Sequence, residues 1–230
     1  MDNIDYISEQ KILLLIPFFL LILGISCSSE QSEKQETVSQ NIPQPTGKTL
    51  VYDCLVEWDL VVKADTNDAW LFLPDTTIHL PRVRSASGAR YATEDYLYWT
   101  KDTEAIIEVG NQSYGTCDLD KEEAVWQDAR LRGATFRASG NEPGWYLEMF
   151  PDSTTIILDY GQDTLKIPTP KPHAQTAQAD TLYKMDAADH SGSIAVKREP
   201  CTLPSGKEFS LITFLTVDEK EYRGCGRMFK

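Results

Sequence analysis

Short segments typical of β-strands, separated by turn residues, run through most of this 230-residue chain. The segments are rich in Val, Ile, Thr, Tyr and Trp, and Asp, Asn, Gly or Pro stands between them, as in antiparallel sheets. In the first half, the expected strands are 49–63, 69–73, 76–81, 94–100, 104–109 and 112–115. In the second half, they are 134–138, 144–150, 153–159, 163–168, 193–198, 209–217 and 219–223. Strands this closely spaced, with few helices, predict an all-β chain of two antiparallel barrels or sandwiches.

A short connecting helix is predicted at residues 120–132, between the two groups of strands. Asp120 can cap a first turn that holds two glutamates, and two arginines stand in the last turn. Acid at the start and base at the end is what the helix dipole favours, and Gly133 can end the helix. The sequence therefore predicts a first β-domain at 48–119 and a second at 133–230.

The N-terminus carries an almost wholly apolar run at residues 12–26, followed by Cys27. The run is shorter than the roughly 20 residues needed to span a bilayer, and it fits the hydrophobic core of a signal peptide. A Cys directly after the cleavage point resembles the lipobox of bacterial lipoproteins, although Gly24 stands where Leu is usual. We predict a lipoprotein signal peptide at 1–26 and lipidation of Cys27. The alternative is an anchor helix that is never cleaved.

Residues 27–47 are predicted to form a disordered tether, because Ser, Gln, Glu, Pro and Thr dominate and little can be buried. Ser28 follows the predicted lipidated Cys27, where Asp would favour retention in the inner membrane. If sorting follows the common enterobacterial rule, the folded part is held at the outer membrane and faces the periplasm.

The cysteine pattern agrees with export. Of the five cysteines, lipidation of Cys27 would leave four, and no Cys-x-x-Cys motif indicates a zinc site or a redox pair. In an oxidising compartment, the economical pairing is Cys54–Cys117 in the first half and Cys201–Cys225 in the second. The alternative is four buried thiols.

Acidic residues are concentrated in the first β-domain. The chain has a formal net charge of −13, and residues 46–123 contain 15 Asp or Glu against 7 Lys or Arg. Residues 124–230 are nearly balanced, with 14 against 13. This distribution argues against nucleic acid as a partner, since nucleic-acid binders carry basic patches. It suits a strongly cationic partner, although surface charge also serves solubility alone.

No arrangement of residues indicates catalysis. The three histidines, His79, His173 and His190, lack metal-ligand spacing, and no P-loop, dinucleotide fingerprint, Gly-x-Ser-x-Gly or His-Glu-x-x-His motif occurs. His79 lies in a strand pattern and is interpreted as structural. We expect neither enzyme activity nor a metal or cofactor.

The run Ser87-Gly88-Ala89-Arg90-Tyr91, followed by Trp99-x-Lys101, is the most specific motif of the chain. With Tyr52-x-Cys54 before it and Tyr114-x-x-Cys117 after it, it resembles the membrane-bound inhibitors of C-type lysozyme over about residues 50–118. Members of that family fold as a small eight-stranded antiparallel barrel, closed by a disulfide between the first and last strands. That pairing matches Cys54 and Cys117.

The resemblance implies a binding role for three residues. Ser87 would enter the active-site cleft of a C-type lysozyme and hydrogen-bond its catalytic carboxyl groups, and Lys101 would add a contact from an adjacent loop. Gly88 would allow the tight turn beside Ser87. Asp102 departs from the family, which usually has Gly after the Lys. The alternative function is a lipoprotein that binds a small ligand or a glycan in a barrel mouth.

The second β-domain contains a run from Phe136 to Trp145 and ends in Tyr222-Arg223-Gly224-Cys225-Gly226-Arg227. Over about residues 133–229 it resembles an uncharacterised domain of bacterial envelope lipoproteins, which implies no mechanism. Asn141-Glu142-Pro143-Gly144 is interpreted as a turn, with Trp145 in the core. A binding role for Arg137 and Glu142 is the alternative.

Overall fold

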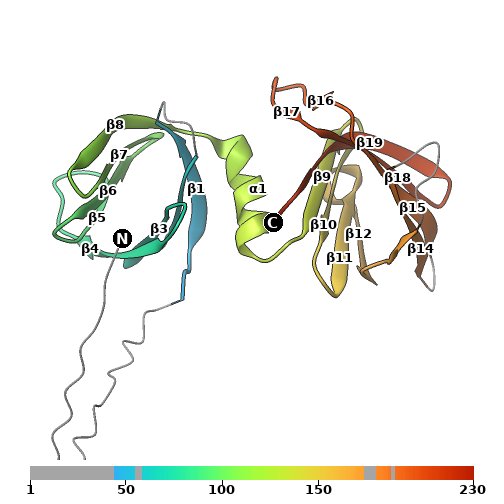
Figure 1. Ribbon diagram of the computed structural model, residues 1–230, viewed down its shortest axis with the longest axis horizontal. Coiled ribbons are helices and arrows are strands. Elements are labelled where there is room, and N and C mark those ends of the chain that lie inside the picture. The colour runs from blue at the N-terminus through green and yellow to red at the C-terminus, as the bar shows by residue number, and fades with distance from the viewer. Residues whose placement is uncertain (1–43, 55–58, 174–179, 188–189) are drawn as a thin grey trace, which may run out of the picture. The chain divides into compact units, whose positions relative to one another are not determined.

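A closed, eight-stranded antiparallel barrel begins the described part of the chain (Figure 1). The computed structural model describes residues 44–54, 59–173, 180–187 and 190–230. The predicted signal peptide, Cys27 and most of the predicted tether lie outside these residues. The barrel strands are β1 (Lys48–Asp53), β2 (Leu60–Ala64), β3 (Asp68–Phe72), β4 (Thr77–Val83), β5 (Ala89–Ala92), β6 (Tyr96–Lys101), β7 (Glu104–Val109) and β8 (Gln112–Leu119).

Each barrel strand pairs with its neighbour in the sequence, and β1 pairs with β8 to close the ring. Tyr52 lies opposite Leu119 at this closing seam. The disulfide Cys54–Cys117 joins the chain just after β1 to β8. An eight-stranded barrel is just wide enough to be filled by its own side chains. The fully buried residues that fill it include Leu60, Val62, Leu71, Leu80, Tyr98 and Ile107.

Two details of the barrel differ from the strands expected from the sequence. The segment 49–63 is not one strand, because β1 ends at Asp53 and β2 begins at Leu60. The segment Ala89–Ala92 is a strand that was not expected. Only four residues long, it lacks a run of β-branched side chains, and it is held by pairing with β4 and β6.

The predicted helix is present as α1 (Lys121–Leu131), within the expected range. Its N-cap is Asp120, whose side chain accepts a hydrogen bond from the backbone N–H of Glu123 at 2.7 Å. Gly133 adopts a φ of 89°, in the left-handed region, and its N–H donates to the carbonyl of Arg130 at 2.9 Å. The sequence signals at both ends of this helix are therefore confirmed.

The second β-rich part is a curled, nine-stranded antiparallel sheet with the strand order β12-β11-β10-β9-β19-β18-β15-β14-β13. A two-stranded ribbon, β16-β17, accompanies it. The bounds are β9 (Phe136–Asn141), β10 (Gly144–Met149), β11 (Ser153–Leu158), β12 (Asp163–Pro168), β13 (Pro172–His173), β14 (Thr181–Ala187), β15 (His190–Lys197), β16 (Cys201–Thr202), β17 (Glu208–Phe209), β18 (Leu211–Val217) and β19 (Lys220–Met228). A short 3₁₀ turn, Asp159–Gly161, joins β11 to β12.

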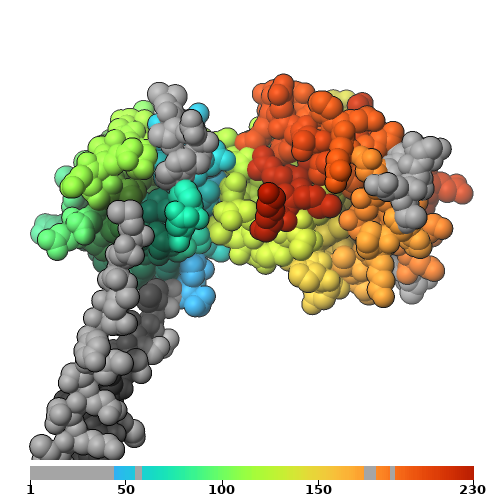
Figure 2. Space-filling model, viewed as in Figure 1, coloured from blue at the N-terminus to red at the C-terminus, as the bar shows by residue number. Residues whose placement is uncertain are grey.

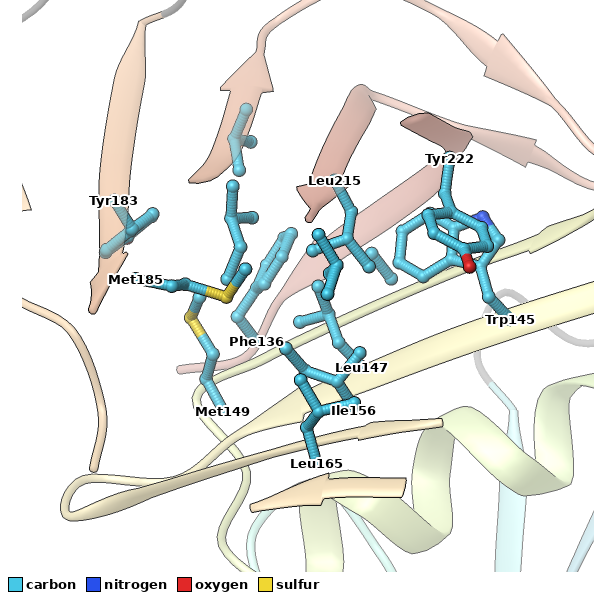
Figure 3. Packing of buried hydrophobic residues seen from close by; sticks show 14 of the residues in the cluster. Phe136, Trp145, Leu147, Met149, Ile156, Leu165, Tyr183, Met185, Leu215 and Tyr222 are labelled. Atoms are coloured by element: carbon cyan, nitrogen blue, oxygen red, sulfur yellow. The ribbon is translucent and has the colours of Figure 1, made fainter. Parts of the chain in front are cut away.

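The curl of the sheet encloses a hydrophobic core of its own (Figure 3). Phe136, Leu147 and Ile156 are almost fully buried there, and the Trp145 ring lies 6.2 Å from that of Tyr222. Trp145 is therefore a core residue, as predicted. The second predicted disulfide, Cys201–Cys225, is also present and joins the two-stranded ribbon to β19.

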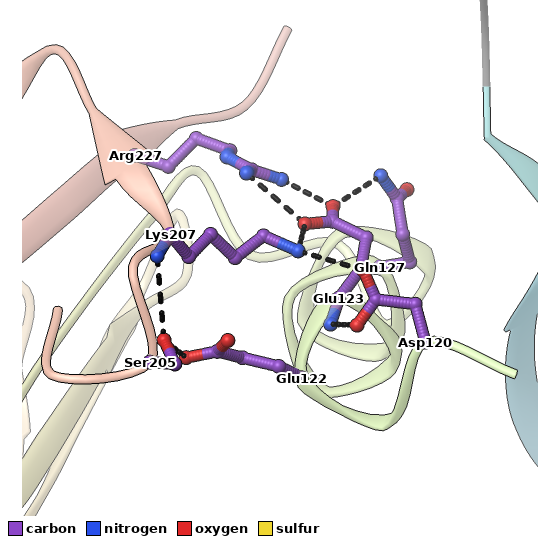
Figure 4. A network of polar contacts seen from close by, with 7 residues as sticks. All are labelled: Asp120, Glu122, Glu123, Gln127, Ser205, Lys207 and Arg227. Carbon is purple, nitrogen blue, oxygen red and sulfur yellow. Dashed lines mark hydrogen bonds and ion pairs between the residues drawn. The ribbon is translucent and has the colours of Figure 1, made fainter. Parts of the chain in front are cut away.

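A polar network attaches α1 to the end of this sheet (Figure 4). The side chain of Glu123 is only 2% exposed and pairs with both Arg227 and Lys207. Burial alone would raise the pKa of Glu123, but the hydrogen bonds from these two cations outweigh it and hold the pKa below its usual range. The ring of Trp126 packs 4.5 Å from that of Phe209. Figure 2 shows the dark red C-terminal end of the chain against the yellow-green helix segment.

The described residues between 44 and 230 belong to one compact unit. The division into separate β-domains at 48–119 and 133–230 therefore stays a prediction. Within the residues that the structure describes, no helix has the length and hydropathy needed to cross a bilayer.

Candidate binding site on the barrel

Ser87 lies on the β4–β5 loop, residues 84–88, and is exposed. The hydroxyl of Ser85 donates to the carbonyl of Gly88 across this loop at 3.1 Å. Gly88 has a φ of +66°, a left-handed conformation that side chains other than glycine rarely adopt. The predicted reason for a glycine after Ser87 is therefore confirmed: the chain turns tightly there.

A second constraint on Gly88 comes from its neighbour across the sheet. A Cβ atom at this position would lie 2.3 Å from the carbonyl oxygen of Thr100 and 3.1 Å from the Cβ of Lys101. Contacts that short are not tolerated against backbone, so only glycine lets the loop approach β6 this closely. The absence of a side chain at residue 88 thus brings Ser87 beside the strand that ends in Lys101.

The indole of Trp99 fixes the loop from the same strand. Its Nε1 donates a hydrogen bond to the carbonyl oxygen of Ser87 at 3.0 Å. This bond uses the backbone carbonyl of Ser87, so it does not involve the hydroxyl of this exposed residue. Sequence reasoning identified Trp99 only as part of a motif and missed this role. The feature of the sequence that could have indicated this role is the position of Trp99 in the strand that leads to Lys101.

Lys101 ends β6 at the β6–β7 turn, where it pairs in register with Glu104. Asp102 follows it with a φ of 55°, again in the left-handed region. Glycine, which the resemblance led us to expect here, adopts this backbone conformation without strain. The hydroxyl of Thr100 donates a hydrogen bond to the carbonyl of Glu104 at 3.1 Å, and this bond stabilises the turn.

Tyrosines inside the barrel support both loops. The hydroxyls of Tyr52 and Tyr98 lie 2.8 Å apart, and Tyr52 also reaches the hydroxyl of Thr100 at 3.0 Å. Burial raises the pKa of Tyr98, so it stays a neutral hydroxyl at physiological pH. Tyr91 stacks on Tyr98 with ring centroids 5.6 Å apart, and its hydroxyl donates to the carbonyl of Asp65 at 2.6 Å. Tyr91, which is 3% exposed, is thus a buried anchor in β5.

The structure brings Ser87 and Lys101 to one hollow of about 210 Å³, which Trp99, Glu104 and Ile106 also line. Ser87 and Lys101 are both exposed. The hollow therefore presents a hydroxyl, which can donate and accept, beside an ammonium and an aromatic ring. This set of groups can bind a polar, acidic target, but it holds no nucleophile activated by a neighbouring base.

Other candidate residues have structural partners. His79 Nε2 lies 2.6 Å from Asp68 Oδ1, which agrees with its structural interpretation. Arg137 is 8% exposed, pairs with Glu148 and lies under the ring of Tyr146 at 4.7 Å. These contacts occupy Arg137 within the fold. In the described part of the chain, no group of three or more His, Cys, Asp or Glu could hold a metal ion.

The comparisons with known proteins concern the barrel. Residues 52–114 match the family described as membrane-bound lysozyme-inhibitor of c-type lysozyme. Over 69 residues the chain is 35% identical to the "Membrane-bound lysozyme inhibitor of C-type lysozyme" of Yersinia enterocolitica serotype O:8 / biotype 1B. This match covers 30% of the chain and 59% of that relative, so the chain spans less than two thirds of the relative's length. No solved structure gives a significant match. Residues 52–114, which hold Ser87, Gly88 and Lys101, are therefore similar to the membrane-bound inhibitors of C-type lysozyme.

Proposed function

We propose that this chain is an envelope lipoprotein that inhibits C-type lysozyme. The β4–β5 loop, which carries Ser87, enters the active-site cleft of the enzyme, and Lys101 makes a second contact. The observation that carries this proposal is that Ser87 and Lys101, both exposed, line one hollow on a barrel whose residues 52–114 match the inhibitor family.

The catalytic carboxyl groups of lysozyme are suitable hydrogen-bond partners for a serine hydroxyl. Lysozyme uses two carboxyl groups, one protonated and one ionised. A hydroxyl can donate to the ionised group and accept from the protonated one, so Ser87 can satisfy both. The hydrogen bond from Trp99 to the Ser87 carbonyl supports this role, because it holds the backbone of Ser87 without using the hydroxyl.

Lys101 can reach acidic groups at the edge of the cleft through its flexible stem. The acidic segment of residues 46–123, which contains the barrel and has 15 Asp or Glu against 7 Lys or Arg, favours the encounter with a cationic enzyme. The chain itself would catalyse nothing, since its role is to occupy another protein's active site.

Anchoring at the membrane is part of the proposal. The thiol of Cys27 would carry the lipid after removal of residues 1–26, and residues 27–47 would act as the tether. The relative from Yersinia enterocolitica is named membrane-bound, which supports this arrangement. We propose the outer membrane, with the folded part facing the periplasm.

The alternative, a small ligand or glycan held in a barrel mouth, is less favoured by the packing. The barrel interior is occupied by side chains such as those of Leu60, Leu71, Tyr98 and Ile107, all with 0% exposure. The curled sheet likewise encloses its own hydrophobic core.

A lysis assay tests the proposal. Purified full-chain protein, added in equimolar and tenfold amounts to a C-type lysozyme, is expected to slow the lysis of a cell-wall suspension in a dose-dependent way. Competition for lysozyme by a chitooligosaccharide that fills the cleft should release the bound inhibitor. Undiminished lysis at tenfold excess would contradict the proposal, and a melting temperature shifted by glycans alone would favour the ligand-binding alternative.

A further inference from the structure

Three apolar side chains lie together on the outer wall of the barrel: Leu97, Trp99 and Ile106, which we call the outer band. Trp99 pairs in register with Ile106 on the next strand. Tyr98 and Ile107, their neighbours along the chain, are 0% exposed and point into the barrel. Because successive side chains on a strand point to opposite faces, the band residues point outward. Their side chains are only half-buried there.

The outer band is continuous with the candidate site. Trp99 and Ile106 line the hollow that holds Ser87 and Lys101. They also line a second hollow of about 360 Å³, together with Leu97. A protein that contacts Ser87 and Lys101 therefore meets the outer band as the next surface on the same wall.

Acidic residues border the outer band on β7. Glu104 lines the first hollow, and Glu108 lines the second, which Arg90 of β5 also lines. Glu108 pairs in register with Leu97, so an acid stands directly beside an apolar residue of the band. An apolar centre with a charged rim is the usual anatomy of a protein–protein interface.

We propose that the outer band is a second contact surface for C-type lysozyme, packed against the enzyme beside its active-site cleft while the β4–β5 loop occupies the cleft. This inference rests on the proposed function, since it takes the same partner. Leu97, Trp99 and Ile106 supply the apolar contact. Glu104 and Glu108 face cationic groups of the enzyme, and their charge opposes the charge of the partner.

Two substitutions on the band test this inference without touching the loop. Leu97→Thr and Ile106→Thr remove apolar surface and keep a residue that favours strands. Each is expected to raise the Kd of the full chain for a purified C-type lysozyme by about tenfold, as for a central interface residue. The control is Val125→Thr, which changes a 46% exposed apolar residue on α1. It should leave the Kd within about twofold, as for a substitution outside the interface.

A charge variant supplies a second measurement in case a band variant folds poorly. Glu108→Gln keeps the size of the side chain and removes its charge. It is expected to lower the association rate constant at low ionic strength, with little difference remaining at high salt. An association rate equal to that of the wild type at low salt would overturn the role of Glu108.

Ser87→Ala, measured in parallel, separates the failure of this inference from that of the proposed function. If Ser87→Ala weakens binding while both band variants bind like the wild type, the outer band is not a contact surface and the proposed function stands. If the wild type does not bind lysozyme, both fail. If sedimentation shows that the band variants dissociate a wild-type dimer and leave the lysozyme Kd unchanged, the band joins two copies of this chain and the inference is overturned.

Discussion

The carbonyl oxygen of Ser87 accepts a hydrogen bond from the indole of Trp99 at 3.0 Å, so the β4–β5 loop is attached to the strand that carries Lys101. This hydrogen bond therefore fixes the positions of the two proposed contact residues, Ser87 and Lys101, relative to each other. A loop that is ordered before binding loses less conformational entropy when it enters a cleft. The affinity of this site should therefore depend on backbone positions around Ser87 as well as on the hydroxyl itself.

Removing either proposed contact should weaken inhibition. Ser87→Ala and Lys101→Ala are each expected to reduce the binding free energy for C-type lysozyme by about 1–3 kcal/mol, as for the loss of a hydrogen bond to a charged group. Calorimetric titration of lysozyme with each variant measures this. Lys121→Ala is the control for a lost lysine charge, because Lys121 lies at the start of α1. Wild-type affinity in both variants would mean that the loop is not the inhibitory element.

Replacing Gly88 should disturb the site more than its φ angle alone predicts. Gly88→Ala places a Cβ atom 2.3 Å from the Thr100 carbonyl, whereas Gly110, with a φ of +58°, has nothing within 4 Å of such an atom. Gly110→Ala therefore imposes the same kind of backbone strain without a clash. We expect Gly88→Ala to lower inhibition at least about tenfold, because a displacement of about 1 Å is costly in a preorganised site. Gly110→Ala should cost about 1 kcal/mol of stability and leave inhibition intact.

Equal loss of inhibition in the Gly88→Ala and Gly110→Ala variants would contradict this reasoning. It would show that general destabilisation of the barrel, rather than the packing of the loop on β6, controls activity. Urea unfolding of both variants, run beside the inhibition assay, separates the two causes.

Replacing Asp102 with glycine, the residue usual in the family, should stabilise the turn after Lys101. Asp102 has a φ of 55°, which glycine adopts without strain, so Asp102→Gly is expected to raise the free energy of unfolding by about 0.5–1 kcal/mol. Asn tolerates the same backbone region, so Asp102→Asn removes the charge with a change under about 0.5 kcal/mol. Thr103→Gly, at a residue outside the left-handed region, should instead lower stability. A gain in stability from Thr103→Gly, with none from Asp102→Gly, would refute this explanation.

The sequence predicted the type of fold more fully than its individual strands. Short segments rich in β-branched and aromatic residues, with turn residues between them, indicated the β-rich parts, and the caps at Asp120 and Gly133 indicated the helix. Strand β14 was missed; among its residues whose burial is described, Tyr183 and Met185 are buried, and the strand pairs with β15 along its whole length. A propensity pattern read along the chain does not contain such contacts.

The site could be predicted only in part, for a related reason. The motif indicated Ser87 and Lys101. Their positions relative to each other depend on the register between β5 and β6, in which Ala89 lies opposite Thr100. That register brings Gly88 against β6 and Trp99 under the loop. The spacing of residues in the sequence does not determine it, because neighbouring registers differ by one residue.

The buried Glu123 should make the stability of the chain sensitive to acid. The hydrogen bonds from Arg227 and Lys207 hold its pKa below the usual range against the effect of burial. A depressed folded-state pKa adds stability that is fully present above the unfolded pKa of about 4.3 and is lost as the pH falls through the folded value. Glu123→Gln keeps the shape and removes the charge, and it should cost roughly 1.5–3 kcal/mol at pH 7.

The difference in unfolding free energy between the wild type and Glu123→Gln should therefore shrink below about pH 4.3, where the wild-type carboxyl group takes up its proton. Urea titrations at several pH values from neutral to acidic measure it. Glu122→Gln is the matched control, since Glu122 accepts a hydrogen bond from Ser205 at 2.7 Å at an exposed position, and it should cost less than about 0.5 kcal/mol. A pH-independent difference for Glu123→Gln would mean that the ion pairs with Arg227 and Lys207 do not stabilise the attachment of α1.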